Sequence, residues 1–178
     1  MRKQKGFSLI ELLIVVAIIL IIAAIAIPNL LRAKISANES SSVGSIRNIV
    51  TAEVSYNASY GGFIGPLTAL GPATSSGCTG STGPTSSNAC LIDFVLASGK
   101  KSGYEFTASG DADAAGNVTG FTIESFPLTY NSTGVRAFCA GEDGVVRVNP
   151  SNTTSGVAGT ATLDKWSAHC VASPWTVL

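Results

Sequence analysis

The sequence predicts an α+β protein in which a long amino-terminal helix packs on a small antiparallel β-sheet. Three observations predict this class. An apolar run continues into an amphipathic pattern over residues 28–60, a Gly-, Pro- and Ser-rich stretch covers 61–102, and short strand-like segments follow within 103–178. A helix that keeps one apolar face needs a second layer to cover that face, and the later strands can supply it.

The composition favours a chain that packs against copies of itself or lies outside the cell. The 178 residues suffice for one domain with an appendage, and the formal net charge is zero, so nucleic acid is not an obvious partner. Without residues 1–6, which hold three basic residues and no acidic one, eight basic residues remain against eleven acidic ones. Charged residues make up only 12% of the chain, which is little for a free cytosolic protein.

The apolar run predicts a membrane-spanning helix over residues 7–27. No charge occurs from Leu12 to Leu31, and roughly 20 apolar residues span the hydrocarbon core of a bilayer. Arg2, Lys3 and Lys5 precede the run, so the positive-inside rule places the amino terminus in the cytoplasm and the rest of the chain outside.

Two simpler explanations of the apolar run fit less well. A secretory signal peptide has an apolar region of about 7–15 residues followed by a small-x-small cleavage site. Here the run is longer, and Ile27-Pro28-Asn29 follows it in place of a cleavage site. A plain signal anchor explains neither Gly6 nor Glu11, because a glutamate in lipid costs several kcal/mol unless it is paired or protonated.

The residues around Glu11 resemble those of a type IV prepilin. The resemblance rests on the basic leader, on Gly6-Phe7-Ser8-Leu9-Ile10-Glu11 and on the long aliphatic helix with Pro28, and it covers about the first 55–60 residues. It implies that residues 1–6 are a leader that a membrane prepilin peptidase removes after Gly6. It also implies that the same enzyme N-methylates Phe7 and that the apolar stretch stays on the mature protein.

Cleavage after Gly6 gives Glu11 a reason to be where it is. It would create a positive amino group on Phe7, and Glu11 follows four residues later, one helical turn on. In a medium of low dielectric constant, an ionised group costs free energy unless an opposite charge lies beside it. The resemblance implies that Glu11 meets the Phe7 amine of an adjacent subunit and so sets the axial register of assembly.

The amphipathic pattern indicates that the helix continues past Pro28 rather than ending at Ile27. Pro28 removes one backbone hydrogen bond, so we expect a kink or a loosened turn around residues 23–28. We expect polar faces at Arg32, Lys34, Arg47 and Glu53, and a helix that reaches about residue 58. The predicted apolar stripe consists of Leu31, Ile35, Val43, Ile46, Val50 and Val54.

Beyond Gly61-Gly62, residues 65–89 have almost no periodicity and predict a long loop. We then expect a meander of about four strands, with the outer half of the helix on one of its faces. Turn residues separate these strands, among them Gly110-Asp111 and Asn131-Ser132. The predicted strands are Tyr104–Ala108, Val118–Phe126, Val135–Cys139 and Val145–Val148.

The four cysteines, Cys78, Cys90, Cys139 and Cys170, all follow the membrane segment and predict two disulfides. No CxxC pair suggests zinc, and four unrelated buried thiols are the alternative. Of the three possible connectivities we predict the nearest pairs, Cys78–Cys90 and Cys139–Cys170. The first would staple the loop and the second would tie the tail to the sheet. Pilins commonly carry a carboxy-terminal region bounded by a disulfide, and the second pair is similar.

No motif predicts catalysis or a cofactor. His169 is the only histidine, and no nucleophile elbow, P-loop or paired histidines occur. Residues 111–117 resemble a calcium loop only faintly, because the fifth position is not a ligand, so we predict a hairpin turn and no metal. Calcium stays an alternative, since some secretion pseudopilins bind it in the head. Trp166 and Trp175 are expected to be packing residues.

The predicted function is structural: a homopolymeric pilus subunit that is not an enzyme. It is expected in the bacterial inner membrane before assembly and in an extracellular filament afterwards. Its expected partners are other subunits, the prepilin peptidase and an assembly machinery with a cytoplasmic ATPase. A type II secretion pseudopilin and a minor pilin share the same amino terminus. A membrane-tethered binding module that never polymerises is the alternative of another class, and it would need neither Gly6-Phe7 nor Glu11.

Overall fold

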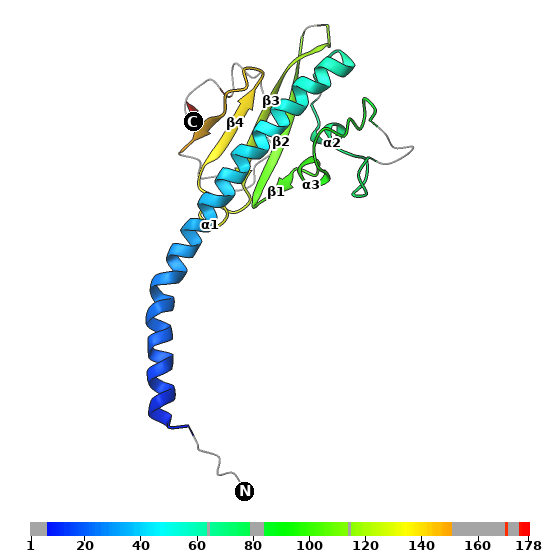
Figure 1. Ribbon diagram of the computed structural model, residues 1–178. Helices are drawn as coiled ribbons and strands as arrows, with labels where there is room; N and C mark the ends of the chain where they lie inside the picture. The colour runs from blue at the N-terminus through cyan, green and yellow to red at the C-terminus, as the bar shows by residue number, and fades with distance from the viewer. Residues whose placement is uncertain (1–6, 64, 79–83, 114, 151–169, 171–174) are drawn as a thin grey trace. The chain divides into compact units, whose positions relative to one another are not determined.

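The computed structural model describes residues 7–63, 65–78, 84–113, 115–150, 170 and 175–178 (Figure 1). Its elements in chain order are α1 (Leu9–Tyr60), α2 (Leu67–Leu70), α3 (Phe94–Ala97), β1 (Lys100–Lys101), β2 (Tyr104–Ala112), β3 (Val118–Pro127), β4 (Ala137–Gly141), β5 (Arg147–Asn149) and β6 (Thr176–Val177). The chain divides into two compact units, residues 1–34 and 35–178. The predicted α+β class is therefore confirmed.

The first unit contributes the apolar part of α1. The helix is unbroken through Pro28, so the alternative of a helix ending at Ile27 is wrong. Its large apolar side chains all face solvent, from Val16 at 46% exposed to Leu9 at 79%. Of the helices that the structure describes, α1 is the one long and apolar enough to cross a membrane.

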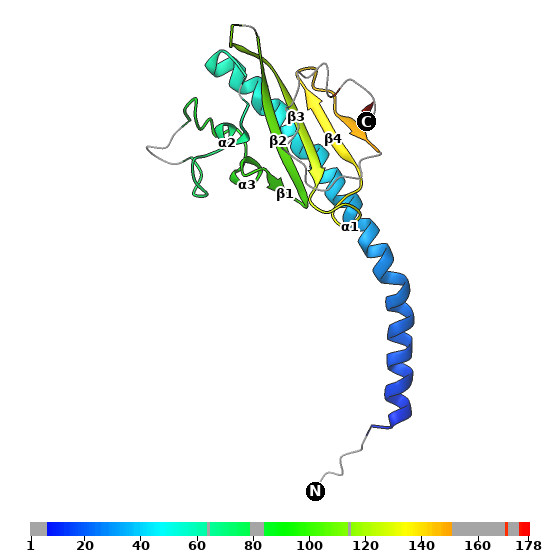
Figure 2. The same ribbon diagram turned by 180° about the vertical axis from the view of Figure 1, so that it is seen from behind.

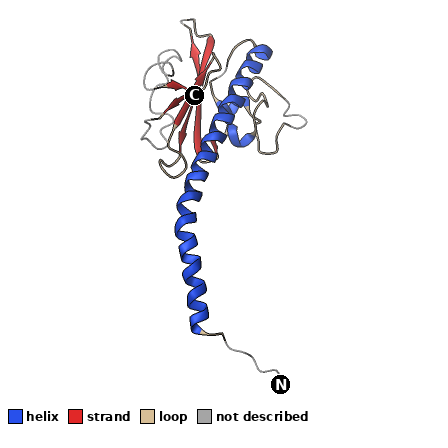
Figure 3. Ribbon diagram, turned by 60° about the vertical axis from the view of Figure 1, so that its left-hand side comes forward, coloured by secondary structure: helices blue, strands red, loops and turns tan. Residues whose placement is uncertain are grey.

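The second unit is a six-stranded antiparallel sheet with the outer part of α1 packed on one face (Figure 2). Neighbours in sequence are neighbours in the sheet, so the strand order runs from β1 to β6 without a crossover. Ile46 and Ile49 are fully buried in one cluster with Phe121, Ile123 and Phe138 from the sheet. Figure 3 shows the helix and the sheet as two layers.

The buried face of α1 differs from the predicted stripe. Val54 is 54% exposed, whereas Glu53, expected on a polar face, is completely buried. The face follows helical spacing through Ile46, Ile49 and Glu53, so it is defined by position more than by residue type. Its members are Glu39, Ser42, Ser45, Ile46, Ile49, Ala52, Glu53 and Tyr56.

The sheet is larger than the predicted four strands. The additional strands β1 and β6 are two residues long, too short to produce a period-two pattern. The predicted turn at Gly110-Asp111 is wrong, because both residues continue β2 and pair with Phe121 and Gly120 of β3. A Cβ on Gly110 would lie 2.6 Å from the Val118 side chain, so this glycine permits a close approach within a strand.

The predicted loop over residues 65–89 begins with a short helix instead. The side chains of Leu67, Ala69 and Leu70 in α2 are buried in the core. The backbone N–H of Ala89 donates to the Ala69 carbonyl, and that of Leu91 donates to the Leu70 carbonyl, each over 2.7 Å. Tertiary burial therefore stabilises a single helical turn that shows no periodicity in the sequence.

Candidate functional site

The candidate site lies in the first turn of α1. Phe7 is 78% exposed and Glu11 is also exposed one turn further along. The backbone N–H of Ser8 donates to Oε2 of Glu11 over 3.4 Å, and the N–H of Leu12 donates to the Ser8 carbonyl over 3.3 Å. Gly6 and the predicted leader lie outside the described residues.

Ser8 is a residue that the sequence analysis missed. Ser8 stands directly before α1 and Glu11 is the third helical residue, which is the spacing of a capping box. The observed Ser8–Glu11 bond is one half of that motif. In the uncut chain the Glu11 carboxylate can therefore cap its own helix, and the signal Ser-x-x-Glu was present in the sequence.

Pro28 lies in the interior of α1. The proline cannot donate a hydrogen bond to the turn before it, so this part of α1 has one backbone bond fewer than its neighbours. A kink at this point stays a prediction.

In the second unit, Glu39 of α1 binds the segment that leads into β4. Its Oε1 accepts the backbone N–H groups of Val135 (3.0 Å) and Arg136 (3.1 Å). Its Oε2 accepts Nε (2.9 Å) and Nη2 (2.7 Å) of the Arg136 side chain. Sequence analysis missed this contact, because 97 residues separate the two partners and no local pattern joins them.

Burial and hydrogen bonding act on Glu39 in opposite directions. Burial raises the pKa of the carboxyl, whereas the Arg136 side chain and the two backbone N–H groups lower it, and the net pKa is below the ordinary value of 4.5. Glu39 is thus ionised at neutral pH although its residue is only 5% exposed. Its charge is held by the bidentate geometry that favours arginine over lysine.

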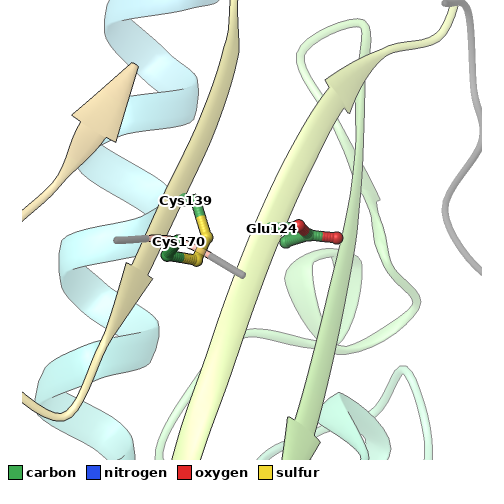
Figure 4. Close-up of side chains that lie close together, drawn as sticks. All are labelled: Glu124, Cys139 and Cys170. Carbon is green, nitrogen blue, oxygen red and sulfur yellow. A yellow bond between two sulfur atoms is a disulfide. The ribbon is translucent and has the colours of Figure 1, made fainter. Parts of the chain in front are cut away.

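Glu124, Cys139 and Cys170 form the one group of potential metal ligands among the described residues (Figure 4). The two sulfurs are bonded to each other, so neither can offer a thiolate to an ion. Glu124 alone would not hold a metal. Trp175 packs against this disulfide, while Trp166 and His169 lie outside the described residues.

The faint calcium loop is a hairpin turn between β2 and β3. Oδ1 of Asp113 accepts the backbone N–H groups of Ala115 (2.8 Å) and Asn117 (2.9 Å), and Oδ2 accepts the Asn117 side chain (3.2 Å). The hydrogen bond from Asn117 lowers the pKa of Asp113. The carboxylate closes the turn, and Asp111, the other acid of the loop, lies in β2.

Comparison with known proteins identifies the family. Residues 1–27 match the model of the prokaryotic N-terminal methylation motif. The chain is 42% identical over 97 residues to the type IV wide pilus major component PilA4 of Thermus thermophilus, which covers 52% of this chain and 74% of that protein. The chain belongs to the type IV pilin family.

A second relative agrees with this assignment. The pilin is 44% identical over 54 residues to the type IV major pilin protein PilA of Myxococcus xanthus, which is 30% of this chain and 24% of that protein. No solved structure matches the chain significantly. Gly6, Phe7 and Glu11 lie within the methylation motif matched over residues 1–27.

The structure of the pilin joins Cys78 to Cys90 and Cys139 to Cys170, with Cα–Cα distances of 6.1 and 5.9 Å. Both distances lie in the usual range for a disulfide. We expect the secreted protein to contain the same two bridges. Peptide mapping without reduction measures this, and a peptide in which Cys90 is linked to Cys139 would contradict it.

Proposed function

We propose that this pilin is a structural subunit that polymerises into a type IV pilus on the bacterial surface. The observation that supports the proposal is the exposed apolar part of α1, in which Glu11 is the only charged residue between Phe7 and Leu31. Such a surface needs apolar neighbours on every side, either lipid or other copies of the same helix. A subunit that passes from a membrane to a filament core meets both needs.

The proposed mechanism is assembly without catalysis by this chain. The apolar helices bundle at the centre of the filament, and residues 35–178 of each subunit form its outer surface. Glu11 of each incoming subunit pairs with the Phe7 amine of a neighbour, which selects one axial position. We assign the work of assembly to a separate cytoplasmic ATPase, as the likeness to type IV pilins suggests.

The proposed route begins in the inner membrane. The basic leader keeps the amino terminus in the cytoplasm, and the part of the chain with the cysteines is outside, where disulfides form. The prepilin peptidase meets the Gly6–Phe7 bond at the cytoplasmic surface. Assembly then moves the helix from lipid to protein neighbours and places the subunit in the extracellular filament.

Electron microscopy of sheared surface material, with mass spectrometry of the filament protein, tests the function. We expect filaments whose main protein is this chain, and their loss when the gene is deleted. A protein that stays in the membrane fraction, with no filament in the presence of an intact assembly machinery, would favour a tethered binding module.

Processing is a separate prediction. We expect the mature chain to begin at N-methylated Phe7, because Gly6 joins a basic leader to an apolar helix. Replacing Gly6 with leucine should slow cleavage at least tenfold, roughly a 1.4 kcal/mol effect or more on recognition, and leave most of the precursor uncut. The mass of the intact subunit measures both. A retained Met1 in the wild-type filament would contradict the cleavage site.

A further inference from the structure

The contact between α1 and the sheet within residues 35–178 has two chemically different ends. From Ile46 to Tyr56 the helix contributes buried apolar side chains to the core. From Asn38 to Ser42 the helix makes polar contacts with the sheet and its connecting loops, which are called the head below. The Asn38 side chain donates to the Thr133 carbonyl (2.8 Å), Ser41 donates to Ser102 (2.9 Å), and Ser42 bonds with Ser125 (2.7 Å).

At the polar end, one carboxylate makes most of the bonds to the segment before β4. Glu39 accepts four hydrogen bonds from Val135 and Arg136, and Arg136 is the only charged residue among these partners. The carbonyl of Arg136 also accepts the hydroxyl of Tyr104 (2.8 Å). Bonds to an ionised acceptor are about twice as strong as neutral ones, so a single neutralisation weakens all four together.

We propose that Glu39 acts as a latch: its charge holds residues 133–136 against α1, and this end of the head can open without the rest of the fold. Loss of its negative charge releases residues 133–136 from α1, while the apolar contact from Ile46 to Tyr56 stays closed. Parts of a fold with few buried apolar contacts open locally at lower free energy than the core. The polar end meets that condition, and its charged partner Arg136 has a half-exposed side chain that water can solvate once the latch opens.

The charge on Glu39 sets the direction of the pH response. The groups that face Glu39 are Arg136 from the β3–β4 connection and Tyr104 from β2, and burial raises the pKa of Tyr104 so that it stays neutral. Because the pKa of Glu39 is lowered, its contribution is complete above about pH 4.5 and is lost as the pH falls through the folded value. The latch is therefore closed at neutral pH and opens in acid.

Hydrogen exchange of the full-length chain in detergent micelles, followed by mass spectrometry of peptides, tests the latch at neutral pH. In Glu39→Gln we expect exchange at least about tenfold faster in peptides from residues 128–136. Peptides from residues 46–56 and 119–125 should exchange as in the wild type. Asp143→Asn is the matched control. It breaks the ion pair between Asp143 and Arg147, whose distance of 2.8 Å is close to the 2.7 Å between Arg136 and Glu39. The Asp143–Arg147 pair does not involve α1.

Two results would overturn the proposal. Unchanged exchange over residues 128–136 in Glu39→Gln would show that the carboxylate does not hold this segment. Equal acceleration over residues 46–56 would show one cooperative unit in which Glu39 has only a structural role. Arg136→Lys guards against a variant that does not fold: it keeps the charge, loses the paired geometry, and should show a smaller local acceleration that is confined to residues 128–136.

Acid provides an independent readout on the unaltered chain. After correction for intrinsic exchange, wild-type protection of residues 128–136 should fall as the pH drops below about 4.5, whereas that of Glu39→Gln should already be low and flat. Protection that falls in parallel in both proteins would assign the change to another group and reject the latch.

Discussion

Replacing Glu11 with alanine is expected to abolish filament assembly while the subunit remains in the membrane. The substitution makes α1 more apolar, so insertion into the bilayer should be unharmed or easier. Residues 35–178 form a compact unit of their own, so the head should fold and form its disulfides as before. In the filament the Phe7 amine would lose its partner, and a charge left unpaired in a buried site costs about 3–5 kcal/mol.

The comparison uses cells that lack the wild-type subunit, with immunoblots of the membrane fraction and of sheared filaments. Glu11→Gln keeps the size and much of the hydrogen bonding of the side chain, so it separates charge from shape. Glu11→Asp keeps the charge on a shorter arm and should assemble in part. Abundant filaments from Glu11→Ala would refute the pairing. Loss of the subunit from the membrane would instead show that Glu11 serves insertion or stability.

Loss of the Cys139–Cys170 bridge should reduce stability and filament yield far more than loss of Cys78–Cys90. Chain entropy alone separates the two by less than about 1 kcal/mol, because the closed segments span 31 and 12 residues. The burial of each disulfide therefore decides which of the two contributes more stability. Cys139 and Cys170 are both fully buried, and Cys139 lies in the middle of β4, whereas Cys78 is exposed.

Paired serine substitutions measure the difference. Replacing Cys139 and Cys170 places two hydroxyls in a fully buried site, and a native disulfide of a small secreted domain contributes about 2–5 kcal/mol. Replacing Cys78 and Cys90 is the matched control, with the same chemical change at one exposed and one half-buried cysteine. Thermal unfolding in detergent and the amount of sheared filament are the readouts. Equal losses in both pairs would show that loop closure, and not burial in the sheet, decides the contribution.

Much of the membrane-facing half of this pilin could be predicted because its signals are local. The length of the apolar run, the basic residues before it and the Gly6-Phe7 and Glu11 spacing are all properties of neighbouring residues. The capping-box spacing of Ser8 and Glu11 is equally local, and a search for that motif would have found it. The methylation motif match over residues 1–27 reflects the same short-range pattern.

The head was predicted less completely, since its decisive contacts join residues far apart in the chain. Gly110 appeared to be a turn residue because glycine is common in turns, yet the close approach of Val118 requires it inside β2. Strands β1 and β6 have two residues each, too few for a pattern, and they are defined by their pairing with β2 and β5. Glu53 lies in the core because of its position on the helix.

By itself, then, the sequence determined the class of the fold, the long apolar helix and the family, because periodicity and motif spacing are encoded within a few helical turns. The tertiary structure alone decided which face of α1 is buried and which groups Glu39 contacts. No pattern of neighbouring residues could place Glu39 against Arg136, because only the packing of the sheet brings the segment before β4 to the side of the helix. The charge on Glu39 is retained at neutral pH because that packing supplies four donors in place of water.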